Sequence, residues 1–284
     1  MGNGILTIGA SGTICLEVVK RLTEKGESVR VGTKSPEKAK AMGLKGVEMY
    51  SFDYLNPDTF TPIFDGMEKW FFVSPAPNYN LTSTVLDVID IAIKSGVKKI
   101  INISLMGIDS PDHPIWQIEN KIASTGIDFS IIRPNCYMQH FNDFLKGCVK
   151  EECAIRVPAG NAKASFIDLR DVAEAAANLI FENNQNNITY TLTGSKTYNM
   201  AEVAETFSKT LNKNIKYFSV SKDEYREILV NLGFSGQAIE EAFFLCDLVK
   251  KGLNSIVTSD ISGILGREAT SLEQFIVDYS DHWK

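Results

Sequence analysis

The sequence has 284 residues, with 29 Lys and Arg against 35 Asp and Glu, and 44% of its residues are hydrophobic. This composition is typical of a globular protein and excludes disordered, collagen-like and disulfide-stapled chains. The formal net charge of −6 favours solubility and creates no attraction to polyanions, so we expect no direct nucleic-acid binding.

The first half of the chain alternates short apolar runs with segments of helical periodicity. We predict strands at residues 5–8, 28–31, 47–52, 70–73, 99–104 and 129–132, and helices at residues 13–25, 36–42, 57–64, 81–95 and 115–124. Several strands are apolar on both faces, which indicates a parallel sheet covered by helices on both sides. The predicted fold class is therefore α/β, with a doubly wound parallel sheet.

After about residue 135 the alternation becomes irregular. We predict helices at residues 141–149, 171–181, 201–211 and 222–232, and strands at residues 188–192 and 215–220. The expected organisation is a dinucleotide-binding domain, residues 1–134, and a smaller mixed α/β C-terminal cap, residues 135–284, interwoven with the sheet. Substrate is expected between the carboxyl edge of the sheet and the cap.

The apolar runs, cysteines and histidines of the sequence indicate the cellular compartment and whether a metal site is expected. No apolar run reaches the eighteen or so residues of a membrane helix, so we expect a cytoplasmic protein that does not enter membranes. The five cysteines are odd in number and form no Cys-x-x-Cys motif, which indicates reduced thiols. The three histidines are far apart in the sequence, so no metal site is expected.

A glycine turn follows the first predicted strand, with the spacing Gly-x-x-Gly-x-x-Cys. Such a turn lets a pyrophosphate approach the backbone at a helix N-terminus, where N–H groups are unpaired. Cys15 stands where a third small residue usually allows close packing of helix and strand. The alternative is a plain turn. We assign five residues of this turn to a dinucleotide cofactor: Gly9, Ser11, Gly12, Thr13 and Ile14.

The end of the second predicted strand indicates NADP rather than NAD. NAD sites usually place an acidic residue there for the ribose hydroxyls, but residues 31–36 contain none. Lys34, helped by Thr33, is suited to a 2′-phosphate, and the alternative is a solvated surface lysine. Further cofactor candidates follow other strand ends, and they are Asp53, Ser74, Pro75 and Pro134. Asp53 could equally cap a turn.

Several segments, taken in order, resemble the NmrA-like family of atypical short-chain dehydrogenases. They are the Gly9–Gly12 turn and the segments 35–39, 72–75, 132–139 and 252–275. The resemblance implies a Rossmann fold with NADP usually preferred. Family members range from NADPH quinone reductases to transcriptional co-regulators that sense NADP without turning it over.

The usual catalytic pair of short-chain dehydrogenases, Tyr-x-x-x-Lys, is absent. No tyrosine of the sequence is followed by a lysine four residues later. In that pair the lysine lowers the pKa of the tyrosine, which passes a proton to a carbonyl. Hydride transfer to a quinone does not need the pair, because the product anion is stable enough to take a proton from water. The protein then mainly has to hold donor and acceptor together.

Three residues are the catalytic or pocket candidates: Ser104 after the fifth strand, Trp116 on the next helix, and Tyr137 after Pro134. Each has a structural alternative, since Ser104 could cap a loop, Trp116 could fill the core, and Tyr137 could bond backbone. His113 is read as a solvated loop histidine or a proton donor. Two acids have supporting roles, Glu119 orienting a neighbour or bonding backbone, and Asp171 acting as a helix N-cap.

Two functions remain open. The first is an NADPH-dependent reductase of a quinone or similar electrophilic small molecule. The second is a non-catalytic, redox-sensing regulator that binds NADP and acts through a protein partner. Either would act as a monomer or a homodimer.

Overall fold

The computed structural model describes residues 4–9, 12–37, 46–75, 79–182 and 187–283. The chain forms two compact units, each of which is described by itself. Unit 1 comprises residues 1–133 and 172–191, and unit 2 comprises residues 134–171 and 192–284. The chain therefore leaves unit 1 after residue 133, returns to it for residues 172–191, and then leaves it again.

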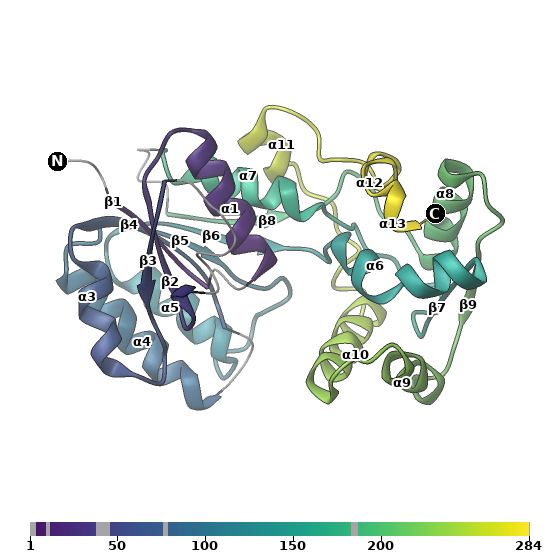
Figure 1. The fold of residues 1–284 in the computed structure, drawn as a ribbon, viewed down its shortest axis with the longest axis horizontal. Coiled ribbons are helices and arrows are strands. Elements are labelled where there is room, and N and C mark those ends of the chain that lie inside the picture. Colours follow the sequence, from purple (N-terminus) through teal and green to yellow (C-terminus); the bar gives the residue numbers. More distant parts are fainter. Residues whose placement is uncertain (1–3, 10–11, 38–45, 76–78, 183–186, 284) are drawn as a thin grey trace. The chain divides into compact units, whose positions relative to one another are not determined.

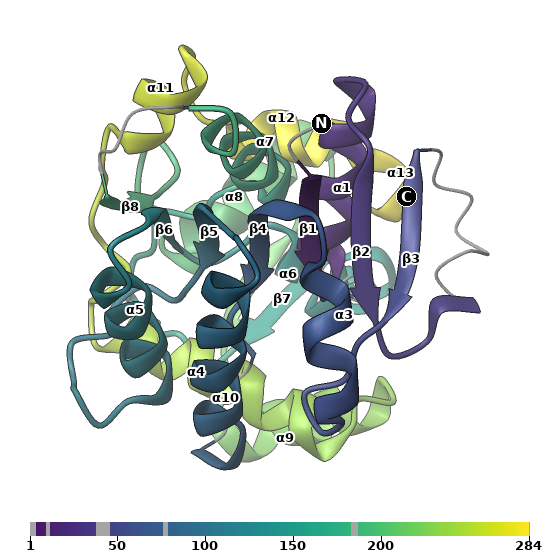
Figure 2. The same ribbon diagram turned by 90° about the vertical axis from the view of Figure 1, so that its left-hand side faces the viewer.

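Unit 1 is built on a seven-stranded sheet, in the order β3-β2-β1-β4-β5-β6-β8 (Figure 2). In chain order the strands are β1 (Gly4–Ile8), β2 (Val29–Thr33), β3 (Val47–Ser51), β4 (Met67–Val73), β5 (Lys99–Ile103), β6 (Asp128–Pro134) and β8 (Ile188–Leu192). All pairings among the first six strands are parallel. The order reverses between β1 and β4, which is the switch point of a Rossmann fold. The predicted fold class is confirmed.

Helices cover both faces of this sheet (Figures 1 and 2). They are α1 (Thr13–Glu24), α3 (Phe60–Phe64), α4 (Tyr79–Lys94), α5 (Pro114–Ser124) and α7 (Leu169–Leu179). A 3-10 turn, Pro57–Thr59, precedes α3. On the face under α3, α4 and α5, strand residues such as Leu6, Trp70 and Phe72 pack with Ile89 and Ile122 in one buried cluster. The opposite face carries α1 and α7. The predicted helix 36–42 extends outside the described residues.

Unit 2 is mainly helical, with a small parallel sheet of β7 and β9. Its elements are α6 (Gln139–Phe144), a π-helical turn (Cys148–Glu152), β7 (Ala154–Val157), α8 (Met200–Leu211), β9 (Lys216–Ser219), α9 (Lys222–Asn231), α10 (Gly236–Lys250), α11 (Asp260–Leu265), α12 (Leu272–Asp278) and α13 (Ser280–Trp283). The segment predicted as one helix, 141–149, is helical with an interruption at Leu145, where α6 ends, and it continues into the π-helical turn.

Local capping explains where the helices of unit 2 begin. The side chain of the residue before each of four helices accepts a hydrogen bond from a backbone N–H in the first turn. These residues are Asn199, Ser221, Ser235 and Ser271. Such caps each contribute about 1 kcal/mol to helix stability. The helices bury one aromatic-rich core, which includes Phe141, Phe207, Phe275 and Trp283.

Three further features concern the cysteines, possible membrane-spanning helices and possible metal ligands. All five cysteines are free thiols. Within those ranges no helix has both the length and the apolar character needed to cross a membrane. The same residues contain no grouping of three His, Cys, Asp or Glu side chains that could hold a metal ion.

Candidate functional site

The glycine turn joins β1 to α1. Gly9 has φ +105°, a conformation that side chains with a β-carbon rarely adopt, and its N–H donates to the Gly32 carbonyl at 3.2 Å. Gly12 is the exposed N-cap of α1, and its N–H donates to the Gly9 carbonyl at 2.9 Å. Gly12 has no side chain to cap the helix, and the first turn carries no acid. The backbone at the start of α1 is therefore suited to an anionic group.

The other predicted members of this turn differ in exposure. Thr13 is exposed and Ile14 is buried, whereas Ser11 lies outside the described residues. Cys15 is buried, and its thiol donates to the Ile8 carbonyl at 3.4 Å. Burial raises the pKa of the Cys15 thiol to about 12, so it stays protonated. Its position beneath Gly9 lets α1 pack closely on β1.

Lys34 follows β2 and forms an ion pair with Asp53, which follows β3. The Lys34 ammonium lies 3.0 Å from the Asp53 carboxylate, and 64% of the lysine side chain is exposed. The Asp53 carboxylate also accepts a hydrogen bond from the Leu55 N–H at 3.0 Å. That backbone bond and the Lys34 ammonium lower the pKa of Asp53. Thr33 is buried, and its hydroxyl accepts from the Ser35 N–H at 3.3 Å, so the lysine stands on an ordered turn.

Ser74 and Pro75 follow β4. The Ser74 N–H donates to the Ile103 carbonyl of β5 at 2.9 Å. The buried amide of Asn102 donates to the Ser74 hydroxyl at 3.1 Å. Pro75 is half-buried. These contacts hold the end of β4 against β5 at the carboxyl edge of the sheet, where nucleotides bind in folds of this class.

Ser104 follows β5, and its hydroxyl donates to the buried carboxylate of Glu119 on α5. The same carboxylate pairs with Arg133 of β6, whose Nε donates to it at 2.9 Å. The hydrogen bond that Arg133 donates to Glu119 raises the pKa of the Arg133 guanidinium. Glu119 therefore joins the end of β5, α5 and β6 through side-chain hydrogen bonds. Of its two predicted roles, orienting a neighbour describes it and bonding the backbone does not.

Two other predicted residues lie at α5. His113 is the N-cap of this helix, since its Nδ1 accepts from the Ile115 N–H at 3.2 Å. Burial lowers the pKa of His113, which favours the neutral ring that this cap requires. The interpretation as a solvated loop histidine is therefore wrong. Trp116 is half-buried on α5 in unit 1, whereas Tyr137 belongs to unit 2.

Pro134, buried at the end of β6, is followed by the residues that form an apolar pocket of unit 2. The wall is made by five parts of the unit: residues 136–145, the segment 157–166, the first residue of α8, α9 and α10. The lining residues are Cys136, Tyr137, His140, Phe141, Phe144, Leu145, Val157, Ala159, Phe166, Met200, Tyr225, Ala242, Leu245, Cys246 and Val249. No carboxylate, lysine or arginine is among them. The volume of the pocket is about 90 Å³.

The titratable groups on this wall are held in their uncharged forms. Burial lowers the pKa of His140 to about 4, so its imidazole is neutral near pH 7. Burial also raises the pKa of the Cys136 thiol to about 12 and that of the Cys246 thiol to about 11. The pKa of the Tyr225 hydroxyl is raised for the same reason. The pocket therefore has an uncharged lining, which disfavours ionic ligands.

Backbone pairing fixes the first part of the pocket wall. The Ile167 N–H donates to the Cys136 carbonyl at 3.0 Å, and the Met138 N–H donates to the Ile167 carbonyl at 2.9 Å. Just before them, the buried amide of Asn135 donates to the Ser165 hydroxyl at 2.6 Å and to the Asn254 carbonyl at 2.9 Å. The register of Tyr137 is thus set by two segments distant in the sequence.

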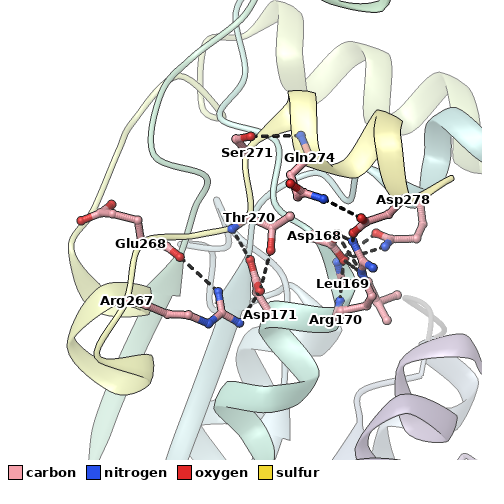
Figure 3. Close-up of polar contacts among 11 residues, drawn as sticks. Asp168, Leu169, Arg170, Asp171, Arg267, Glu268, Thr270, Ser271, Gln274 and Asp278 are labelled. Carbon is pink, nitrogen blue, oxygen red and sulfur yellow. Dashed lines mark hydrogen bonds and ion pairs between the residues drawn. The ribbon is translucent and has the colours of Figure 1, made fainter. Parts of the chain in front are cut away.

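A buried network of charged side chains supports this pairing (Figure 3). Asp168 accepts from the Gln139 amide at 2.8 Å and from the Arg170 guanidinium at 2.7 Å. Arg170 also bonds Asp278 of α12, with 2.6 Å between Nη2 and Oδ2. The pKa of Arg170 is raised, mainly by its hydrogen bond to Asp168. Through Gln139, this network anchors the first residue of α6 beside His140.

Asp171 is a second buried acid, three residues after Asp168, and its predicted role as an N-cap is wrong. The capping residue of α7 is Asp168, whose carboxylate accepts from the Arg170 N–H at 2.8 Å. Asp171 instead accepts from Arg267 at 2.8 Å, and from the Thr270 N–H at 2.6 Å (Figure 3). It therefore binds the C-terminal segment to the start of α7.

The sequence analysis missed His140, Tyr225 and Cys246 as pocket residues. His140 stands three residues after Tyr137, and their rings meet edge to face with 5.8 Å between centroids. A signal for α10 was present, because Ile239, Ala242, Cys246 and Val249 have helical spacing after the cap Ser235. No local signal could have shown that α9 and α10 meet α6.

The model of the NmrA-like family matches residues 1–276. The chain belongs to the NmrA-like family. This confirms the resemblance inferred from its segments.

Relatives span nearly the whole chain. It is 27% identical over 275 residues to prestalk A differentiation protein A of Dictyostelium discoideum, covering 95% of this chain and 90% of that protein. It is 25% identical over 278 residues to the NAD(P)H azoreductase of Xenophilus azovorans, covering 95% of this chain and 96% of that protein. The NADPH-dependent quinone oxidoreductase QOR2 of Escherichia coli, solved with NADPH, has the same fold, with a TM-score of 0.84, 23% identity and coverage of 97% and 99%.

Proposed function

We propose that this protein is an NADPH-dependent reductase that transfers a hydride to a quinone or a similarly electrophilic, uncharged small molecule. The observation that carries the proposal is the pocket of unit 2, whose aromatic rings and uncharged groups suit a flat, conjugated acceptor. Membership of the NmrA-like family and the name of the Xenophilus azoreductase support reductase chemistry. The name of QOR2 agrees with a quinone as acceptor.

The cofactor would lie at the carboxyl edge of the sheet in unit 1. The backbone N–H groups of Thr13 and Ile14, in the uncapped first turn of α1, would face the pyrophosphate, and Gly9 and Gly12 would let it approach the backbone closely. Ser74, Pro75 and Pro134, at the ends of β4 and β6, would line the rest of the cofactor. When bound, NADPH supplies the hydride.

Preference for NADPH over NADH would rest on Lys34. Its ammonium is well exposed and would pair with a 2′-phosphate. Asp53 lies 3.0 Å from that ammonium, so a 2′-phosphate would have to share Lys34 with the carboxylate or displace it. Lys34 would therefore favour NADPH over NADH, and the carboxylate of Asp53 would limit that preference.

The residues around the acceptor would bind and orient it rather than act as a strong acid. The chain has no Tyr-x-x-x-Lys pair, and Ser104 already donates its hydroxyl to Glu119. Tyr137 and the other aromatic rings of the pocket would stack on a flat acceptor and exclude water from it. Water would then protonate the reduced product after it has formed.

The proposal is tested by following NADPH oxidation at its absorbance band with a panel of quinones, azo compounds and other conjugated electrophiles. NADH and the Gly12→Val variant serve as controls. We expect turnover with at least one quinone, faster with NADPH than with NADH, and lost in the variant. Binding of NADPH without oxidation across the panel would contradict a reductase of this class.

A second candidate is a regulator that binds NADP without turnover and acts through a protein partner. The missing Tyr-x-x-x-Lys pair favours it, as does the name of the Dictyostelium relative, which refers to differentiation rather than catalysis. Such a sensor would bind the oxidised and reduced cofactors with different affinities and would oxidise neither. Equilibrium binding of NADP and NADPH, measured beside the turnover panel, separates the two candidates.

A further inference from the structure

The pocket of unit 2 is not closed, and its inner space of about 90 Å³ is smaller than the cavity of about 150 Å³ that encloses a benzene ring in another protein. A ring ligand would therefore fill this space and reach into the opening.

Two polar side chains on this wall have no hydrogen-bond partner within the described part of the chain. One is the imidazole of His140, which contacts the rings of Tyr137 and Phe144 but pairs with no polar group. The other is the hydroxyl of Tyr225, a residue that is only 2% exposed. Tyr225 is buried and His140 is half-buried. Polar groups with little access to water normally find a partner, so two unpaired ones on the wall of one pocket indicate a ligand that supplies it.

The chemistry of both groups limits that ligand. A neutral imidazole has one N–H donor and one acceptor nitrogen, and a phenol has one O–H donor. Because burial keeps His140 and Tyr225 uncharged, they offer hydrogen bonds without an ionic attraction. The remaining wall is apolar or carries protonated thiols, so a charged ligand would lose its hydration without compensation.

We infer that His140 and Tyr225 are the substrate-recognition residues of this pocket, donating hydrogen bonds to the carbonyl oxygens of an uncharged single-ring quinone. The inference rests on the proposed function and names the residues that select its acceptor. His140 and Tyr225 would touch the substrate directly. Neither residue was singled out by its sequence context.

The same hydrogen bonds would assist the reaction. Bound NADPH would supply a hydride, that is two electrons and one proton, leaving NADP+, and the quinone would become a monoanion with its negative charge on oxygen. Water donates the second proton, and the hydroquinone leaves. The N–H of His140 and the O–H of Tyr225 strengthen their bonds to the oxygen as its charge develops, and neither group loses its proton.

The test compares two ligands of the same shape on the full protein saturated with NADP+, so that no hydride is available. Tetramethyl-1,4-benzoquinone has two carbonyl oxygens and no free ring position for attack by a thiol. 1,2,4,5-Tetramethylbenzene has the same four methyl groups and no oxygen. Dissociation constants are measured from the quenching of intrinsic fluorescence. We expect the wild-type protein to bind the quinone at least about tenfold more tightly, as a hydrogen bond of about 1.4 kcal/mol would give.

Three variants locate this preference. Tyr225→Phe removes only the hydroxyl, and His140→Phe keeps a flat ring without a donor. Each should weaken quinone binding about tenfold and change hydrocarbon binding less than about twofold. His140→Gln, which retains an N–H donor, should recover part of the quinone affinity. Tyr279→Phe is the matched control, because Tyr279 lies in unit 2 away from the pocket wall, and its binding should equal the wild type.

The outcomes separate this inference from the proposed function. Equal losses for both ligands would mean that His140 and Tyr225 only shape the pocket, which overturns the inference. Failure of both ligands to bind, with NADPH oxidation by another acceptor intact, would overturn the inference and leave the reductase proposal standing. Selective quinone binding with no NADPH oxidation would support recognition by these residues and contradict the reductase proposal. Circular dichroism establishes that each variant is folded.

Discussion

The glycine turn of unit 1, proposed to bind a pyrophosphate, is built from near neighbours in the chain such as Gly9, Gly12 and Thr13, whereas the pocket of unit 2 takes its lining from segments between residues 136 and 249. The shape of the turn is set by local dihedral angles such as φ +105° at Gly9. The pocket offers side chains whose properties depend on neighbours, since burial keeps His140 and the thiols of Cys136 and Cys246 uncharged. A local motif can thus be recognised in a sequence, but a pocket that depends on burial cannot.

Gly12→Val tests whether the turn acts through its open backbone. In the structure a β-carbon at Gly12 would meet only the Gly9 carbonyl, at 3.4 Å, which is ordinary contact. The variant should therefore fold with stability within about 1 kcal/mol of the wild type. It should lose at least about 100-fold in affinity for both NADPH and NADH, because several phosphate hydrogen bonds are blocked. Calorimetric titration measures the loss.

Gly236→Val is the matched control for that change, since Gly236 opens α10 and a β-carbon there meets no atom within 4 Å. Its cofactor affinity should be unchanged. Retained binding in Gly12→Val would remove the phosphate argument for the turn.

Asp171→Ala tests how strongly the C-terminal segment supports unit 2. The change leaves the Thr270 N–H without its acceptor and removes the partner of Arg267. Because Asp171 is 1% exposed, we expect the free energy of unfolding to fall by about 2–4 kcal/mol. Urea denaturation followed by circular dichroism measures it.

The control for Asp171→Ala is Glu273→Ala, which breaks the ion pair of Lys196 and Glu273. Both side chains of that pair are about half exposed, so the effect should stay below about 1 kcal/mol. Equal losses in the two variants would show that burial of the network contributes nothing.

The uncharged state of His140 predicts a pH-dependent stability. The pKa of His140 in the folded protein is about 4, below the ordinary value of 6.5, so the unfolded chain takes up the proton first as pH falls. Relative to His140→Phe, the wild type should keep its stability above about pH 7 and lose it between about pH 6.5 and pH 4. The slope should be at most about 1.4 kcal/mol per pH unit. A pH-independent difference between the two proteins would mean that His140 is solvated.

The Lys34 and Asp53 pair predicts opposite shifts in cofactor preference. Lys34→Ala should weaken NADPH binding about tenfold and NADH binding less than about twofold, because only NADPH carries the 2′-phosphate. Asp53→Asn should strengthen NADPH binding about twofold to threefold by removing a negative charge 3.0 Å from the ammonium. Both effects should shrink at high salt, since Lys34 is 64% exposed. Equal losses for the two cofactors in Lys34→Ala would reject the assignment.

Asp168 and Asp171 show why the roles of buried acids could not be predicted from the sequence. Asp168 and Asp171 stand three residues apart before and within α7, and either acid is a plausible cap. The sequence analysis chose Asp171, but the hydrogen bond from the Arg170 N–H goes to Asp168. Asp171 faces Arg267 and Thr270, almost a hundred residues later, and no pattern near residue 171 records that contact.

His113 and Ser104 show the same limit in unit 1. Their residue types suit proton transfer, which made both of them candidates. In the structure His113 caps α5, and Ser104 donates to Glu119. Glu119 is itself paired with Arg133, so a buried acid that could have been catalytic is used to join three elements.

The sequence by itself determined the alternation of strands and helices in unit 1, the parallel sheet and the glycine turn, because each depends on residues that are neighbours in the chain. It also determined the resemblance to the NmrA-like family. Only the tertiary structure decided that α6, α9 and α10 enclose one pocket and that His140 and Tyr225 stand unpaired in its wall. The reason is physical, since burial and hydrogen-bond partners are properties of packed surfaces, and the segments that create them lie up to about 110 residues apart in the chain.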